Sequence, residues 1–176
     1  GTFMGTNPMG RQSIRFPQPP VVRGFASVAG KKEREGPLGD QFTATVQDTT
    51  FGEKSWEQAE RRMQQMTLEL ALEKAGLTDA DLDAAFAGDL LNQCIGSSFS
   101  LRNRGVPTLG LYGACSTMAE SLLLAAMSVS GGFARTALAM TSSHFASSER
   151  QYRFPLGYGG QRTPTSQWTV TGAGAV

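Results

Sequence analysis

The chain has 176 residues, of which 40% are hydrophobic and 18% are charged, and its formal net charge at pH 7 is +1. This is the size and composition of an ordinary globular domain with a real hydrophobic core. Basic residues are interleaved with acidic ones instead of forming a stripe, so nucleic acid is not an expected partner.

Residues 1–20 lack the cationic segment followed by an apolar stretch that a secretory signal needs, so we expect no such signal there. Residues 1–8 open on Gly1 instead of a methionine, so we interpret them as a remnant of expression. We expect the natural start near Met9 or Met4. Residues up to about Phe51 are rich in glycine, proline and charge. This composition predicts extended or looped backbone and no helix.

The first persistent periodicity predicts a helix from Trp56 to the glycine at position 76. Ser55 is the expected cap, with Gln58 three residues on as its capping-box partner. Apolar side chains then recur at helical spacing, namely Trp56, Ala59, Met63, Met66 and Leu70. The two methionines are expected to fill the core and need no other function.

Short apolar runs and helical segments alternate after position 76. Thr78 and Asp81 predict a short helix, and a polar stretch over 91–103 and an amphipathic one over 117–130 predict two more. The buried strands are expected at 83–88, 106–113, 135–143 and 167–176. This order predicts an α/β fold with a mainly parallel sheet covered by helices.

Ligands of such folds gather at the carboxyl ends of the strands. Asp89, Cys115 and His144 each follow a predicted strand closely. We therefore expect these three residues near one rim of the sheet.

Cys115 lies in the segment "LYGACSTM", at a tight corner between a strand and a helix. Gly113 and Ala114 allow the turn, and Ser116 or Thr117 can cap the helix, with Glu120 at capping-box spacing from Thr117. A thiol at the amino end of a helix is stabilised as thiolate by the helix dipole. The alternative is that Cys115 is a small buried residue filling a crowded bend.

The other candidates also have plain structural interpretations. Asp89 is either a ligand residue or the cap of the segment that follows it. His144 is the single histidine of the chain, so it makes no metal site alone and can be a hydrogen-bonded core residue.

Cys94 has no motif around it and is assigned to packing. Neither cysteine has the spacing of a zinc site or a disulfide framework. The reduced cysteines predict an intracellular protein, and the longest apolar run, Leu122 to Met127, is far shorter than the roughly 20 residues of a membrane span.

The motifs "GLTDADLDAAFAGD" and "GACSTM" resemble the corresponding parts of the thiolase-like superfamily, the second being its nucleophile turn. The motifs "GKKEREGPLGDQF", "TSSHFASSERQYRFP" and "YGGQRTPTSQWTVTGAGAV" resemble its stage V sporulation branch over residues 9–176. The resemblance implies a thiolase-like layered fold, and a chain that ends with the first of the two thiolase halves. The catalytic partners of the cysteine come mainly from the second half, so acyl transfer by this chain alone is not supported.

The resemblance implies a binding protein and no enzyme. Members of this branch hold dipicolinic acid, or its calcium chelate, in the pocket that corresponds to the superfamily's active site. The positions that the resemblance carries to this pocket are Asp89, Asn92, Cys115, His144 and Arg150. No other cofactor is implied.

The segment "SERQYRFPLGYGGQR" mixes arginines with aromatic residues. Such a mixture suits a planar dianion, and it equally suits a subunit interface, which we favour. The resemblance implies a homo-oligomer, membrane subunits of a spore transport complex as partners, and a place in the forespore and spore at the inner spore membrane. Its implied role is dipicolinic acid uptake in sporulation and release in germination. The alternative is a thiolase-type acyltransferase or condensing enzyme with Cys115 as nucleophile.

Overall fold

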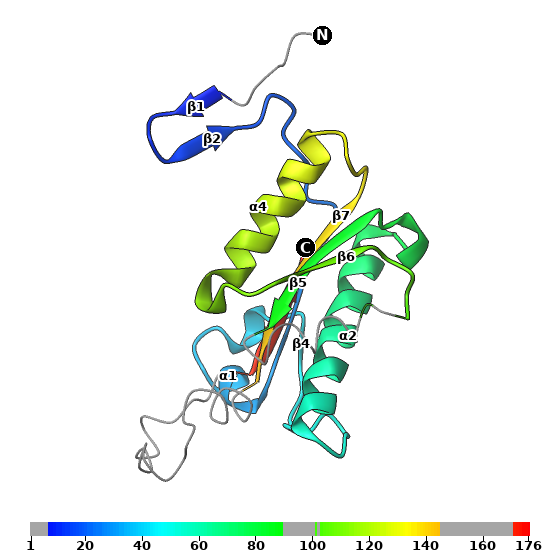
Figure 1. Ribbon diagram of the computed structural model, residues 1–176. Helices are drawn as coiled ribbons and strands as arrows, with labels where there is room; N and C mark the ends of the chain where they lie inside the picture. Colours follow the sequence, from blue (N-terminus) through cyan, green and yellow to red (C-terminus); the bar gives the residue numbers. More distant parts are fainter. Residues whose placement is uncertain (1–6, 90–100, 102, 145–170) are drawn as a thin grey trace, which may run out of the picture.

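The computed structural model describes residues 7–89, 101, 103–144 and 171–176. Its centre is a six-stranded sheet in the order β4-β3-β8-β7-β5-β6, with helices α2 and α4 on opposite faces (Figure 1). The strands are β3 (Ala26–Ala29), β4 (Ala44–Thr45), β5 (Ala84–Asp89), β6 (Thr108–Leu111), β7 (Ala137–Ser143) and β8 (Gly172–Ala175). Strands β5, β6 and β7 are mutually parallel, as are β3 and β4, whereas β8 runs antiparallel to β3 and β7. The sheet is therefore mixed and mainly parallel, as predicted.

Helix α2 (Trp56–Ala75) has the predicted bounds. The Ser55 hydroxyl accepts a hydrogen bond from the backbone nitrogen of Gln58, which satisfies one of the free donors at the helix start. Gly76 ends the helix in the left-handed conformation, with φ of 66°. The apolar stripe of α2 packs on one face of the sheet, which we call the α2 face.

Each face of the sheet has its own core because side chains alternate along a strand. On the α2 face, Leu68 and Leu72 pack against Ala85, Ala87 and Met140. Helix α4 (Thr117–Ser130) covers the other face, which we call the α4 face. The α4 core consists of Phe86, Leu111, Ala125 and Ala139.

Several sequence-based expectations need correction in the first 51 residues. Helix α1 (Lys31–Arg34) and the short 3-10 helix η1 (Gly39–Gln41) lie where only loops were expected. Strand β3 lies buried in the sheet between β4 and β8, and its run of small residues between glycines has little periodicity. A hairpin of β1 (Asn7–Met9) and β2 (Ser13–Arg15) forms a separate two-stranded sheet.

The later elements follow the prediction closely. The short helix is the 3-10 helix η2 (Asp79–Asp81), whose capping box joins Thr78 and Asp81 in both directions. Strand β6 is not buried as predicted, because it lies at the sheet edge and exposes Leu109. Most of the helix predicted over 91–103 and the first part of the strand predicted over 167–176 lie outside the described residues.

Candidate functional site

The carboxyl ends of the parallel strands β5, β6 and β7 meet at one edge of the sheet. Asp89 is the last residue of β5 and pairs in register with Ser142 on β7. His144 directly follows the end of β7, and Cys115 comes shortly after β6, in the 3-10 helix η4 (Ala114–Ser116). The structure therefore brings Asp89, Cys115 and His144 to one rim, as predicted.

The two faces of the sheet separate these residues within the rim. Ala85 and Ala87 lie in the α2-face core, so alternation along β5 puts Asp89 on that face as well. His144 also lies there, because its ring contacts Trp56 of α2. Cys115 precedes α4 and belongs to the opposite face. The sequence did not predict this division, because strand order and facing depend on the tertiary structure.

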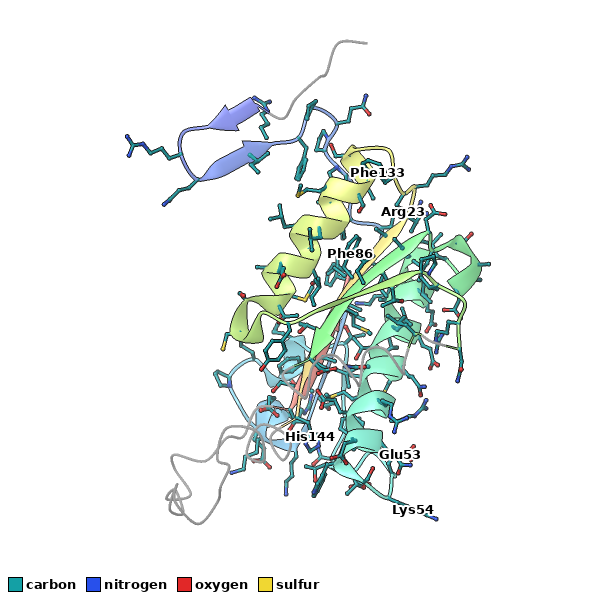
Figure 2. The ribbon with its side chains drawn as sticks, in the orientation of Figure 1. Arg23, Glu53, Lys54, Phe86, Phe133 and His144 are labelled. Atoms are coloured by element: carbon teal, nitrogen blue, oxygen red, sulfur yellow. The ribbon has the colours of Figure 1, made fainter. Side chains whose placement is uncertain are left out.

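His144 is fully buried and held by its neighbours (Figure 2). Its Nε2 lies 2.8 Å from the carbonyl oxygen of Thr49, and since a carbonyl only accepts, Nε2 carries the proton. Burial lowers the pKa of His144 below its usual 6.5, although the Thr49 carbonyl and the Glu57 carboxylate act in the other direction. The imidazole is therefore favoured in its neutral form.

The loop before α2 fixes the position of the Thr49 carbonyl. The Asp48 carboxylate accepts hydrogen bonds from the Thr50 hydroxyl and from the backbone nitrogens of Thr50 and Gly52. These bonds, with the Thr50 hydroxyl contributing most, lower the pKa of Asp48. Phe51 takes a positive φ of 52° within this turn. The loop thus holds the acceptor that orients His144.

A buried polar network next to His144 was missed by sequence reasoning. The Ser142 hydroxyl donates to Glu60 Oε1 at 2.8 Å and accepts from Gln64 Nε2 at 2.6 Å. All three side chains are buried between α2 and β7. The available signal was that Glu60 and Gln64 share the helix stripe of Met63, where an apolar residue is the norm. This network connects α2 to the end of β7 that carries His144.

The corner around Cys115 is built differently from the predicted capping box. The Ser116 hydroxyl donates to the Gly113 carbonyl, and the Gly113 nitrogen donates to the Thr117 hydroxyl. Ser116 is the residue at the cap position, but its side chain makes no capping bond. Both hydroxyls therefore fasten the turn onto the helix start. Cys115 is a free, exposed thiol and does not fill a buried bend.

Cys115 lines a cavity of about 360 Å³ on the α4 face of the rim. Helix α1 contributes Glu33, the loop after η1 contributes Phe42, and α4 contributes Met118. The end of β7 and the approach to β8 contribute residues that carry hydroxyl groups, including Ser143 and Thr171. The cavity thus combines an aromatic ring, an apolar thioether, a thiol, hydroxyls and one carboxylate.

Glu33 is the second residue that sequence reasoning missed. Its Oε2 is buried and has no hydrogen-bond partner among the described residues. Helix α1 is tied to the floor of the cavity, because the Gly30 nitrogen donates to the Thr171 carbonyl at 2.8 Å. The only sequence signal was the acid at position 33 within a loop-like, charged segment. An anionic ligand in this cavity therefore meets a carboxylate.

The remaining predicted site residues, Asn92 and Arg150, lie outside the described residues, as does Cys94. Within the described ranges, no group of three histidine, cysteine, aspartate or glutamate side chains is placed to hold a metal ion. No helix in the described part of the chain is long and apolar enough to cross a membrane.

Comparison with known proteins identifies the family. The family model of stage V sporulation protein AD (SpoVAD) matches residues 10–176. The chain belongs to the SpoVAD family. It is 46% identical over 167 residues to stage V sporulation protein AD of Bacillus subtilis (strain 168), and the match covers 95% of this chain and 49% of that protein. The chain therefore spans about half the length of this relative, and a role in sporulation follows from the family.

Solved structures with the same fold are thiolase-like condensing enzymes, so the predicted fold class is confirmed. Similar chains include 3-oxoacyl-(acyl-carrier-protein) synthase III of Aquifex aeolicus VF5, with a TM-score of 0.56 and 17% identity over 90% of this chain and 53% of that one. A priming β-ketosynthase of a polyketide pathway gives 0.57 and 18%, over 88% of this chain and 48% of the enzyme. Xanthomonas campestris OleA with bound lauric acid and lauroyl-CoA gives 0.55 and 15%, over 88% and 54%. At these identities the likeness is one of fold.

Proposed function

We propose that this chain is part of a non-catalytic SpoVAD-family subunit that binds dipicolinic acid in the Cys115 cavity. The subunit would serve dipicolinic acid uptake during sporulation and its release in germination. One observation carries the choice of binding over catalysis: His144 is bonded to Thr49 on the α2 face, whereas Cys115 opens on the α4 face.

A cysteine nucleophile needs a base within hydrogen-bond reach and donors for the developing oxyanion. The described lining of the Cys115 cavity contains no histidine and no lysine or arginine. Its one carboxylate, that of Glu33, comes from α1. The thiol is therefore better suited to contact a ligand than to attack one.

The cavity lining suits part of a flat aromatic diacid. Phe42 and Met118 offer an aromatic and an apolar wall, and the hydroxyl-bearing residues Ser143 and Thr171 line the same cavity. The Glu33 carboxylate opposes a dianion, so the ligand needs cationic groups elsewhere. Arg150 and a calcium ion carried by the ligand are the candidates for this role.

Calorimetric titration of the longest natural form of the chain with dipicolinic acid, with and without calcium, tests the proposal. We expect saturable binding and a raised melting temperature. Cys115→Trp should abolish both effects by filling the cavity, and Cys94→Ser serves as the control. In a Cys94→Ser background, dipicolinic acid should also slow the alkylation of Cys115 by iodoacetamide. The absence of binding in both conditions would overturn the proposal.

The alternative is acyl transfer, and the fold shared with condensing enzymes together with the accessible thiol of Cys115 favours it. The step would move an acyl group from the sulfur of coenzyme A to Cys115 Sγ and release the coenzyme A thiol. Mass spectrometry after incubation with acyl-CoA tests this step. A stable acyl adduct that is lost in Cys115→Ala supports the enzyme, and an unmodified chain supports the binding protein.

We propose further that the subunit is a homo-oligomer that works with membrane subunits of the same transport complex at the inner spore membrane. The exposed apolar side chains on the outer face of α4, such as Leu123 and Met127, support an interface there. Light scattering of the purified chain tests the assembly. A monodisperse monomer would count against it.

A further inference from the structure

The net charge of the chain is close to zero, but the charged residues are distributed unevenly along the sequence. Five of the sixteen basic residues fall within the first 32 positions, which contain no acidic residue. The other eleven share the rest of the chain with all fifteen acidic residues. The interleaving of charges inferred from the sequence therefore holds only after position 32. The five residues are Arg11, Arg15, Arg23, Lys31 and Lys32.

Three of these basic residues lie on a projecting segment, residues 10–25, which we call the N-terminal arm. Its strand β2 pairs only with β1, in a small sheet separate from the central one. Figure 1 shows this hairpin beyond the body of the molecule, at the end of α4 that lies away from Cys115. Arg11, Arg15 and Arg23 are exposed and form no ion pair with any described residue.

The arm also exposes large apolar side chains. Ile14 is 51% exposed, Val21 80%, Val22 62% and Phe25 61%. Lys74 of α2 lies over the Phe25 ring, 5.0 Å from its centroid, and adds a further positive charge. Large apolar side chains beside unpaired arginines are unusual on a surface that faces only water.

The body of the molecule extends this surface where the arm joins it. Residues 20–24 line a cavity of about 270 Å³ together with the C-terminal parts of α2 and α4 and the beginning of β7. Phe133, in the turn after α4, is 89% exposed, and Figure 2 shows it at the same end of the molecule as Arg23. Arg135 lines the same cavity and is also exposed.

We propose that the N-terminal arm and Phe133 form a docking surface for an anionic lipid bilayer. Arginines attract the negative surface potential of such a membrane, and apolar side chains enter the boundary between headgroups and acyl chains. An acidic protein segment without apolar side chains would satisfy the arginines but leave the apolar side chains of the arm in water. The surface lies at the opposite end of the sheet from the Cys115 cavity, so the inference does not depend on the proposed ligand. It rests on the proposed place at a membrane and adds direct contact with lipid, so a chain that binds no vesicles would overturn the inference and leave attachment through membrane subunits standing.

Co-sedimentation with vesicles tests the inference on the whole chain. We expect binding to vesicles of phosphatidylglycerol and phosphatidylcholine, little binding to phosphatidylcholine alone, and weakening as salt rises from 50 to 500 mM. The triple variant Arg11→Glu, Arg15→Glu, Arg23→Glu should lose affinity roughly a hundredfold, since each basic residue contributes about a fivefold factor. Phe133→Ser should weaken the binding that remains at high salt.

The matched control is Lys31→Glu, Lys32→Glu, Lys54→Glu, which changes the net charge equally but lies away from the arm. Lys54 lies at the far end of the molecule in Figure 2. This variant should keep most of its affinity for the anionic vesicles. Equal binding to neutral and anionic vesicles, equal losses in both triple variants, or no vesicle binding by the chain would each overturn the inference. Circular dichroism spectra matching the parent chain establish that the variants fold.

Discussion

The Trp56 indole and the His144 imidazole lie against each other, with ring centroids 5.2 Å apart and planes inclined by 40°. This contact joins the first turn of α2 to the end of β7, across a long separation in sequence. Together with the bond from His144 to the Thr49 carbonyl, it accounts for the buried position of the ring. The single histidine of the chain thus connects the start of α2 to the end of β7. Its protonation should therefore change the free energy of unfolding.

The stability of the chain should fall as the pH drops below about 6.5, the usual pKa of histidine. Burial lowers the pKa of His144 in the folded state, so the unfolded chain takes up the proton more readily. The loss begins near the unfolded pKa and continues until the pH reaches the lower folded value. Calorimetric melting between pH 8 and pH 5 measures it, and His144→Gln should flatten this part of the profile. An unchanged slope in the variant would contradict the assignment to His144.

Ser142→Ala should destabilise the chain by about 1–3 kcal/mol, because its hydroxyl bridges the buried Glu60 and Gln64 side chains. Urea unfolding measures the change. The control is Ser13→Ala in the exposed hairpin, which should stay within about 0.5 kcal/mol of the parent chain. Equal effects at the two sites would show that the buried network contributes nothing measurable.

Gly88→Ala should distort the corner that carries Cys115. A Cβ at Gly88 would approach Thr117 Cγ2 to 2.5 Å and would also collide with the Leu111 carbonyl. We expect a loss of about 1–3 kcal/mol from this overpacking and a changed rate of Cys115 alkylation. At Gly174, in the same sheet, the nearest atom to a Cβ is Met118 Sδ at 3.8 Å. Gly174→Ala is therefore the matched control, and a loss of the same size there would refute the steric explanation.

Glu33→Gln should strengthen the binding of free dipicolinic acid by roughly fivefold, because it removes one negative charge from the cavity wall. The gain should be smaller when calcium is present, since the chelate carries less negative charge. Glu35→Gln, at the exposed end of the same short helix, is the control and should leave the affinity unchanged. Parallel calorimetric titrations compare the variants. Equal affinities of the Glu33→Gln and Glu35→Gln variants would show that Glu33 does not lie near the bound ligand.

The sequence by itself determined the elements whose signals are local. Ser55 and Gly76 bound α2 because a side-chain cap and a left-handed glycine act within one turn. The apolar runs at β5 and β7 and the amphipathic segment of α4 were predicted for the same reason. The chain order of these elements was enough to bring Asp89, Cys115 and His144 to one rim.

Only the tertiary structure decided which of these residues lie on the same face of the sheet. His144 and Asp89 lie on the α2 face and Cys115 on the α4 face, because facing depends on the register and order of strands that are distant in sequence. The same holds for Glu33, whose loop-like segment folds into α1 and joins the cavity through the bond between Gly30 and Thr171. Local pattern fixes what an element is, and long-range packing fixes what its side chains meet.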